Sequence, residues 1–568
     1  MDLFAVAEKL RLLYGEEEGR KAHRRLVRLV EEFQREPRTP GPDWLRERDV
    51  VLITYGDSIV EEGLAPLRSL ARFARSFLTG LVSAIHILPF YPYSSDDGFA
   101  VIDYWQVSDQ LGSWADISDL AQDFDLMFDA VVNHISAQSQ WFQKYLAGDP
   151  AFQDFFITCD PGADLSQVIR PRALPLLTPF VTSQGEKHLW TTFSADQIDL
   201  NYKNPEVLLK MVELLLFYVK KGARYLRLDA VGFLWKELGT SCLHLPQTHW
   251  IIQIFRAVLD QAAPGTLLIT ETNVPHRDNI SYFGDGTNEA HLVYQFPLPP
   301  LTLYSFLTGD ASKLTAWAAS LEPCSKKTSF FNFLASHDGI GLLPVQGILE
   351  EAELQLLLDQ TQAHGGLISY RNSPAGSLSP YELNISYLNA LSHPEESPEL
   401  KAKRFLAAHA ILLSLQGVPG IYIHSLLGSE NYWEGYASSG IKRRINRQKL
   451  ERAQLERELA DPASLRSLVF TGFGKLLKTR RSQPAFHPNA PQRILDLGPE
   501  LFTVLRGQGP EAILCLINVT GTTQRRKLAG ISPDLAPEAV DLLTGRSFAL
   551  DQPLTLEPYE ILWLKSRP

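Results

Sequence analysis

The sequence predicts an α/β fold: a (β/α)8 TIM barrel with loop insertions after strands 3 and 7 and a C-terminal antiparallel β domain. Short apolar runs rich in β-branched and aromatic residues alternate with longer stretches of helical period. Eight such runs end in polar residues or glycine, which fits a closed, helix-wrapped parallel barrel better than an open sheet. They are residues 50–55, 84–89, 126–132, 225–230, 267–272, 292–296, 329–336 and 420–424.

Two segments interrupt this alternation, and the pattern changes again near residue 486. Residues 135–204 and 342–404 follow the third and seventh runs, and long insertions there lie on the rim where barrel active sites form. From about residue 486, short alternating strands are separated by Gly, Pro and Asn. We expect an N-terminal helical extension (1–46), barrel parts (47–134, 205–341 and 405–485), an inserted domain B (135–204), an inserted domain B-prime (342–404) and a C-terminal β domain (486–568).

Composition restricts the classes of partner. Hydrophobic residues make up 45% and charged residues 21%, as in soluble globular proteins. A net charge of −11 disfavours a nucleic-acid or anionic-membrane surface, although a single pocket can still be basic. The four cysteines show no metal-ligand spacing, and the charged amphipathic N-terminus is unlike a secretory signal. We expect a cytoplasmic protein without metal or cofactor; a homodimer is left open.

Charged residues stand at the ends of four of the predicted strands. They lie in FDAVVNH, YLRLDAVGF, LLITETN and FLASHDGIG. Residues two apart on a strand share a face, so Arg227 and Asp229 point the same way. Because a charge facing the surrounding helices would be costly, this pair is expected to face the barrel mouth. Arg227 would also favour the ionised form of Asp229.

Each of these residues alone has a plainer interpretation. The pair Arg227 and Asp229 suits a structural ion pair, His134 a hydrogen-bonded core or capping histidine, and Glu271 a helix-start carboxylate. Together, however, they place acidic groups at four strand ends that one barrel mouth would bring together. Such an arrangement is costly without a function, and it favours an active site.

These motifs resemble those of the α-amylase superfamily, glycoside hydrolase family 13. The resemblance runs from about residue 48 to the C-terminus, with the motifs in the family's order and at compatible spacing. It implies that Asp229 is the nucleophile, Glu271 the general acid/base and Asp338 the transition-state stabiliser. It also implies that His134 and His337 bind glucosyl hydroxyls. An ionised and a protonated carboxyl about 5–5.5 Å apart suit double displacement with retention, and this chemistry needs no metal.

Further residues resemble the sucrose phosphorylase branch of this family. YPYSSDDGFAVIDY and RRINR have counterparts that close the pocket behind a single glucosyl unit. The resemblance implies that Asp96 pairs with Arg447 there, with Asp97 as the alternative one residue on. IRPR implies a phosphate-binding role for Arg172, and SPYELN one for Tyr381. A solvated loop arginine is the alternative for Arg172, although an arginine fork suits phosphate.

The acceptor side departs from the sucrose phosphorylases. Asn273 stands where a histidine is usual, Glu382 where a glutamine is usual and Phe233 where a tyrosine is usual. This pattern is similar to that of the glucosylglycerate phosphorylases and, less closely, the sucrose 6-phosphate phosphorylases, both of which take anionic acceptors. The basic run 442–444 could attract such an anion or be a solvated loop.

The sequence therefore predicts a retaining glycoside phosphorylase. Its expected reaction is the reversible phosphorolysis of 2-O-α-glucosylglycerate to α-D-glucose 1-phosphate and glycerate, so its partners would be a small sugar substrate and inorganic phosphate. The alternatives are a sucrose, sucrose 6-phosphate or glucosylglycerol phosphorylase, an α-glucosidase, and a non-catalytic binding subunit on the same barrel. The intact carboxylates disfavour the last of these.

Overall fold

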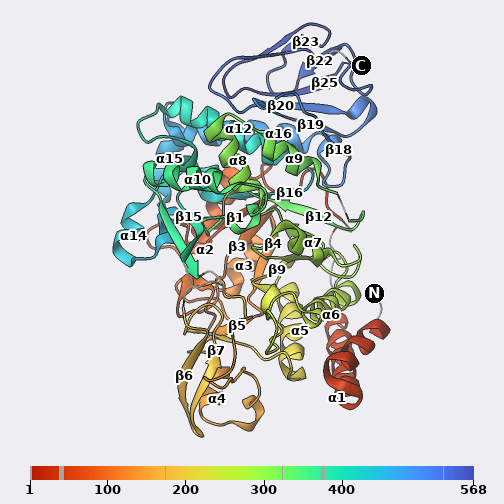
Figure 1. The fold of residues 1–568 in the computed structure, drawn as a ribbon, viewed down its shortest axis with the longest axis vertical. Coiled ribbons are helices and arrows are strands. Elements are labelled where there is room, and N and C mark those ends of the chain that lie inside the picture. The colour runs from red at the N-terminus through yellow and green to blue at the C-terminus, as the bar shows by residue number, and fades with distance from the viewer. Residues whose placement is uncertain are drawn as a thin grey trace.

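A closed barrel of eight parallel strands forms the centre of the molecule (Figure 1). The computed structural model describes residues 3–36, 42, 44–172, 174–322, 324–372, 378–528 and 530–567; parts of two predicted segments, 37–41 and 373–377, lie outside these ranges. In order around the barrel the strands are β1 (Val51–Thr54), β16 (Val418–Tyr422), β12 (Ser329–Asn332), β11 (Leu292–Tyr294), β10 (Leu267–Thr270), β9 (Ala223–Leu228), β4 (Asp125–Ala130) and β3 (Ala84–Ile87). Each coincides with one of the eight predicted runs, so the predicted barrel is confirmed.

Helices cover the outside of the barrel and connect its strands. The outer face of a parallel barrel must be buried, and the sequence supplies amphipathic or largely apolar helices for it. These are α2 (Pro66–Phe73), α3 (Trp114–Leu120), α5 (Pro205–Lys220), α6 (Pro246–Ala262), α7 (His276–Ile280), α8 (Leu298–Thr308), α9 (Ser312–Ala319), α12 (Pro398–Ser414), α13 (Ile423–Leu426), α15 (Arg452–Ala460) and α16 (Leu465–Arg481). The short α14 (Trp433–Ser439) instead borders the barrel mouth, where it lines a pocket with Tyr55 and Arg447. The helix α1 (Leu3–Gln34), interrupted by a non-helical Gly15, packs on α5 and α6.

The chain leaves the barrel twice, after β4 and after β12. The first excursion extends away from the barrel at the bottom of Figure 1 and contains β5 (His134–Ser136), α4 (Gln140–Leu146), β6 (Leu177–Thr182), β7 (Gly185–Trp190) and β8 (Gln197–Asp199). The second contains β13 (Ile340–Gly341), α10 (Glu351–Ala363), β14 (Leu367–Asn372), β15 (Leu378–Asn384) and α11 (Tyr387–Leu391). Both excursions start where a barrel strand ends, and they build walls around the barrel mouth.

The C-terminal part is an antiparallel β structure, as predicted. One sheet of six strands has the order β18 (Gln492–Ile494), β19 (Leu501–Arg506), β20 (Ile513–Asn518), β25 (Ile561–Ser566), β22 (Glu538–Asp541) and β23 (Ser547–Ala549). A smaller pair is formed by β21 (Gln524–Arg526) and β24 (Leu554–Leu556). This part lies at the far end of the molecule from the first excursion (Figure 1).

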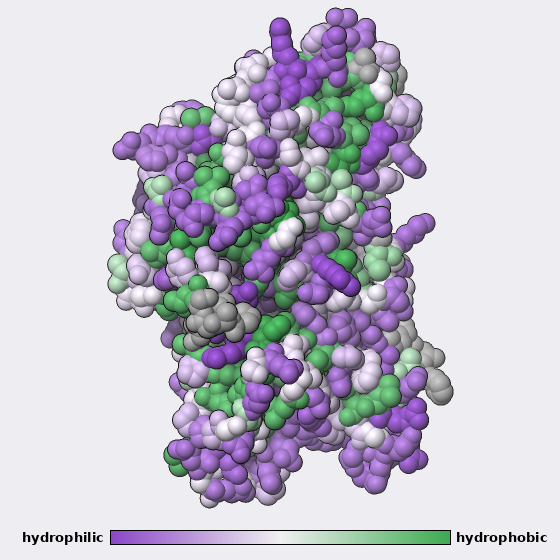
Figure 2. Space-filling view, in the orientation of Figure 1, coloured by the Kyte–Doolittle hydropathy of each residue, from purple (hydrophilic) through white to green (hydrophobic). Residues whose placement is uncertain are grey.

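The surface, the cysteines and the helices of the described residues give no sign of a disulfide, a membrane-spanning helix or a metal site. The face in Figure 2 is mainly hydrophilic, with hydrophobic residues in scattered patches. All four cysteines lie in the described part of the chain, and none is in a disulfide. No helix among the described residues is sufficiently long and apolar to cross a membrane. Within the same residues, no group of three or more His, Cys, Asp or Glu side chains is placed to hold a metal ion.

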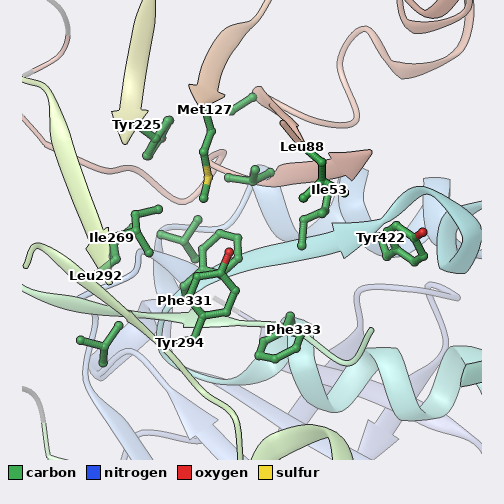
Figure 3. Close-up of a cluster of buried hydrophobic side chains, with 14 of the residues drawn as sticks. Ile53, Leu88, Met127, Tyr225, Ile269, Leu292, Tyr294, Phe331, Phe333 and Tyr422 are labelled. Atoms are coloured by element: carbon green, nitrogen blue, oxygen red, sulfur yellow. The ribbon is translucent and has the colours of Figure 1, made fainter. Parts of the chain in front are cut away.

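Large apolar and aromatic side chains fill the barrel interior. Figure 3 shows Met127, Tyr225, Ile269 and Phe331 within this cluster. Glycine at position 420 of β16 makes room for it, because a Cβ atom there would lie 2.5 Å from two ring atoms of Phe331. That spacing is far inside van der Waals contact, so the ring and the strand can pack only without a side chain at position 420.

We expect Gly420→Ala to lower stability by about 1–3 kcal/mol, the usual cost of overpacking a core. Thermal unfolding followed by circular dichroism measures this loss. The double variant with Phe331→Leu should recover part of it, because the smaller side chain vacates the contested volume. Equal thermal midpoints for Gly420→Ala and the unmodified protein would contradict the packing argument.

Candidate active site

Arg227 organises the carboxylates at the barrel mouth. It lies on β9 opposite Asp129 of β4, and its guanidinium is ion-paired with Asp129 and donates to Asp229 Oδ1 at 2.8 Å. Its second terminal nitrogen lies 3.8 Å from Glu271 Oε2. The prediction that Arg227 and Asp229 share a face is therefore correct. A single cation lies beside both of the carboxyl groups that double displacement requires.

Asp129 and His86 fix the position of that cation. His86 Nε2 lies 2.7 Å from Asp129 Oδ2, and both side chains are buried. Burial alone would raise the pKa of Asp129, but Arg227 and His86 outweigh it and lower the pKa to about 2. Asp129 thus stays ionised and neutralises Arg227. The sequence interpretation missed His86, although a polar residue inside the apolar run AIHILPF could have drawn attention to it.

Glu271 has the protonation behaviour of a general acid. It directly follows β10, where burial raises its pKa, Arg227 opposes this, and the charges of Asp229 and Asp338 raise it further, to about 7. The backbone N–H of Ala230 donates to Glu271 Oε2 at 3.1 Å, and Ala230 adopts a left-handed conformation (φ 49°). Left-handed residues other than glycine are often found at active sites, and here the conformation of Ala230 accompanies the hydrogen bond from its N–H to Glu271.

Asp338 is held as an anion by several cations. Burial would raise its pKa, but the charges of Arg443, Arg447 and Arg227 together lower it well below the usual range. Arg443 is ion-paired with Asp338, and Arg447 lies 3.8 Å from its Oδ1. Burial lowers the pKa of His337 to about 3, so its ring is neutral, and it stacks on Phe99. The three predicted catalytic carboxyl groups thus lie together. Burial raises the pKa of Asp229 although the charge of Arg227 opposes the shift, so the pKa values of Asp229 and Glu271 move upward while that of Asp338 moves downward.

The predicted pairing of Asp96 with Arg447 is wrong, and the alternative partner, Asp97, is the one observed. Arg447 Nη1 donates to Asp97 Oδ2 at 2.7 Å, and Arg444 also pairs with Asp97. Asp96 instead accepts from Gln197 Nε2 at 3.2 Å. The reason is a tight turn in which Asp96 and Asp97 have φ of 53° and 47°, so consecutive side chains leave the backbone in different directions.

Gln197 links Asp96 to the predicted sugar-binding histidine. Its Nε2 lies 3.2 Å from His134 Nε2, and that histidine nitrogen is 3.0 Å from the Phe99 carbonyl oxygen. Arg172 Nη2 lies 3.8 Å from Asp96 Oδ2, and its side chain is one-third exposed. Asp96, His134 and Arg172 thus border one region. The sequence interpretation missed Gln197, which lies in the inserted DQIDLN segment without a distinguishing pattern.

The basic run 442–444 is neither a free anion site nor a solvated loop. Arg443 donates to both carboxylate oxygens of Glu382, at 2.8 and 3.1 Å, while it also pairs with Asp338. Lys442 donates to the backbone carbonyl of Ile368 at 2.7 Å. Glu382 is buried and also accepts from the Gly339 N–H. Its carboxylate therefore balances Arg443 at the edge of the site.

A pocket with a mainly apolar wall lies beside Glu271. The predicted acceptor-side residues Phe233 and Asn273 line it, and so does Tyr381, whose pKa is raised by burial to about 12. Phe233 packs edge-on against Phe193, with ring centroids 5.6 Å apart. Its other lining residues include Ile169, Pro171, Leu243, His244, Val274, Leu343 and Arg371. The sequence interpretation missed His244 and Arg371.

Comparison with known proteins identifies the group to which the chain is similar. Residues 77–342 match the model of the α-amylase catalytic domain. The chain is 52% identical to the glucosylglycerate phosphorylase of Allomeiothermus silvanus, across 99% of this chain and 98% of that protein. It is 32% identical to the sucrose phosphorylase of Agrobacterium vitis, across 78% and 89%.

The fold is also similar to that of a solved phosphorylase structure. The crystal structure of sucrose 6F-phosphate phosphorylase from Thermoanaerobacter thermosaccharolyticum superposes with a TM-score of 0.72 at 24% identity, covering 91% of this chain and 99% of that one. This likeness concerns the fold, whereas the sequence relationship above extends over nearly the whole chain. The protein therefore belongs to the α-amylase family, glycoside hydrolase family 13, and within it to the glycoside phosphorylases.

Proposed function

We propose that this protein catalyses the reversible phosphorolysis of 2-O-α-glucosylglycerate to α-D-glucose 1-phosphate and glycerate. The observation that carries the proposal is the arrangement of Asp229 and Glu271 around Arg227 beside a pocket lined by Asn273 and Phe233. Retaining transfer requires one ionised and one protonated carboxyl group in this relation. Similarity to a glucosylglycerate phosphorylase at 52% identity supports the choice of substrate.

In the first half of the reaction, Asp229 takes the glucosyl group. Its carboxylate attacks the anomeric carbon while Glu271 transfers its proton to the departing 2-oxygen of glycerate. Asp338, held ionised by Arg443, would stabilise the positive charge that develops on the sugar ring. His134, His337 and Asp96 would bind the glucosyl hydroxyls, with Arg447 fixed by Asp97 behind them.

In the second half, phosphate attacks the same carbon and displaces Asp229. The second inversion restores the α-configuration, so the product is α-D-glucose 1-phosphate. Arg172 and Tyr381 would hold the phosphate, since Arg172 is close to Asp96 and Tyr381 lines the adjoining pocket. Phosphate brings its own nucleophilic oxygen, so Glu271 matters less in this half.

The synthetic direction tests the choice of acceptor. Glucose 1-phosphate is supplied with glycerate, fructose, fructose 6-phosphate or glycerol in turn, and phosphate release is measured. We expect release with glycerate to exceed that with each other acceptor and with water. Release with glycerate no greater than with water would refute the substrate assignment, and preference for fructose or its 6-phosphate would support the corresponding alternative.

A further inference from the structure

Arg371 lines the pocket beside Glu271 without a carboxylate partner. It lies on β14, which pairs with β15, the strand that carries Tyr381. Among the described residues no Asp or Glu side chain pairs with it, and its Nε is buried without a hydrogen-bond partner. Burial lowers the pKa of its guanidinium, and Tyr381 opposes that shift. Removing such a cation partly from water costs free energy, which a bound anion would offset.

Four other arginines near the site already have close carboxylate partners, and a fifth, Arg172, lies 3.8 Å from Asp96 and does not line this pocket. Arg227 pairs with Asp129 and Asp229, and Arg443 pairs with Asp338 and Glu382. Arg444 and Arg447 share Asp97. Of the residues that line the pocket in the described part of the chain, Arg371 alone is a lysine or arginine. An anion in this pocket would therefore meet Arg371 as its direct counter-charge.

Two further side chains in the pocket have unused hydrogen-bonding atoms. Asn273 Oδ1 and His244 Nε2 are buried, and neither has a hydrogen-bond partner within the described part of the chain. Burial lowers the pKa of His244 to about 4, so the ring is neutral, and its Nδ1 lies 2.6 Å from the Tyr282 hydroxyl. His244 has φ of 56°, a conformation that a non-glycine residue rarely holds without a local purpose.

The chemistry of these three groups selects a class of ligand. An arginine fork matches a planar carboxylate or a phosphate. The free oxygen of Asn273 needs a donor, which a hydroxyl provides, and His244 Nε2 can exchange a hydrogen bond with a second oxygen. The apolar wall made by Phe233, Leu243 and Val274 suits a carbon skeleton. A small hydroxy acid satisfies all of these features, whereas phosphate can meet the polar groups but has no carbon skeleton for the apolar wall.

We propose that Arg371 recognises the carboxylate of the acceptor and, with Asn273 and His244 binding its oxygens, selects hydroxy acids over neutral polyols. This inference rests on the proposed function, since it names the residue that makes glycerate the preferred acceptor. Arg371 is thus a specificity-determining residue that takes no part in glucosyl transfer to Asp229. A carboxylate and a phosphate can both accept paired hydrogen bonds from an arginine, so both ligands are tested.

Arg371→Gln removes the charge while keeping a polar, hydrogen-bonding side chain, although a shorter one. We expect the KM for glycerate to rise about 10- to 100-fold, the loss of one charge-assisted hydrogen bond, with a smaller rise in Arg371→Lys. The KM for phosphate in phosphorolysis should stay unchanged, as should phosphate release from glucose 1-phosphate into water. Release with glycerol, which has the hydroxyls but no carboxylate, should not fall. Arg525→Gln, on an exposed strand of the C-terminal part, is the matched control and should behave as the unmodified protein.

The outcomes separate the two proposals. If the unmodified protein releases no more phosphate with glycerate than with water, the proposed function fails before Arg371 is considered. If the unmodified protein uses glycerate and Arg371→Gln leaves its KM unchanged, the present inference is wrong. A rise in the KM for phosphate alone would reassign Arg371 to phosphate. An equal loss with glycerate, glycerol and water would assign it a structural role, which also overturns the inference.

Discussion

Replacing Asp229 with alanine should lower the rate of glucosyl transfer by about four orders of magnitude or more, a barrier increase of at least ~5 kcal/mol. The carboxylate is expected to form the covalent bond to the sugar, and nothing else at the mouth can do so. Glu271 is drawn toward the protonated state, and Asp338 is paired with Arg443. Initial rates of phosphate release from glucose 1-phosphate with saturating glycerate measure the loss.

A small external nucleophile distinguishes a lost nucleophile from a damaged site. Azide should partly restore release of phosphate by Asp229→Ala, with formation of β-glucosyl azide, because it attacks from the face that the carboxylate has vacated. Asp496→Ala, at an exposed position in the C-terminal part, provides a control for general effects. Undiminished activity of Asp229→Ala would refute the double-displacement mechanism.

Replacing Glu271 with glutamine should slow transfer in a way that depends on the leaving group. A positioned acid typically contributes about 10²–10⁴-fold, and it matters most when the departing oxygen is basic. Phosphorolysis of glucosylglycerate should therefore fall by that factor, whereas transfer from α-glucosyl fluoride, whose leaving group needs little protonation, should fall much less. Parallel initial rates with the two donors measure the difference, and equal losses would contradict the role of Glu271.

The pKa of Glu271 adds a pH dependence to the same role. Because burial and the nearby charges of Asp229 and Asp338 raise it to about 7, the proton needed by the glycerate oxygen is lost as pH rises through that value. The kcat for phosphorolysis should decline on the alkaline side, near pH 7. In Glu271→Gln that decline should disappear, since no titrating proton remains at this position. If kcat of the variant still declines near pH 7, another titrating group causes the decline.

The barrel could be predicted from the sequence because its strands are short, apolar and buried on both faces. The runs 223–228 and 267–270 show this pattern, and charged residues that interrupt it, such as Arg227, stand out. In a closed barrel, position along a strand fixes position at the mouth. For this reason the meeting of Arg227, Asp229 and Glu271 could be expected before the structure was known.

The loops could not be predicted in the same way. The choice between Asp96 and Asp97 depends on two successive left-handed residues. Aspartate tolerates that conformation, but the residue type does not show which of the two side chains turns toward Arg447. The partners of Arg443 lie 61 and 105 positions earlier in the chain, and only the packing of the second excursion against the barrel brings them together. Arg371 stands out for the opposite reason, because no carboxylate of the described residues pairs with it, and a sequence does not show that an ion pair is missing.

Phosphorolysis of 2-O-α-glucosylglycerate followed by proton NMR shows whether phosphate receives the glucosyl group and whether the α-configuration is retained. The anomeric signals identify each product as it forms, before mutarotation or secondary reactions change it. Retaining transfer from Asp229 to phosphate predicts α-D-glucose 1-phosphate and glycerate as the first products, in equal amounts. Formation of β-glucose 1-phosphate would contradict double displacement, and formation of free glucose at the same rate with or without phosphate would show a hydrolase instead.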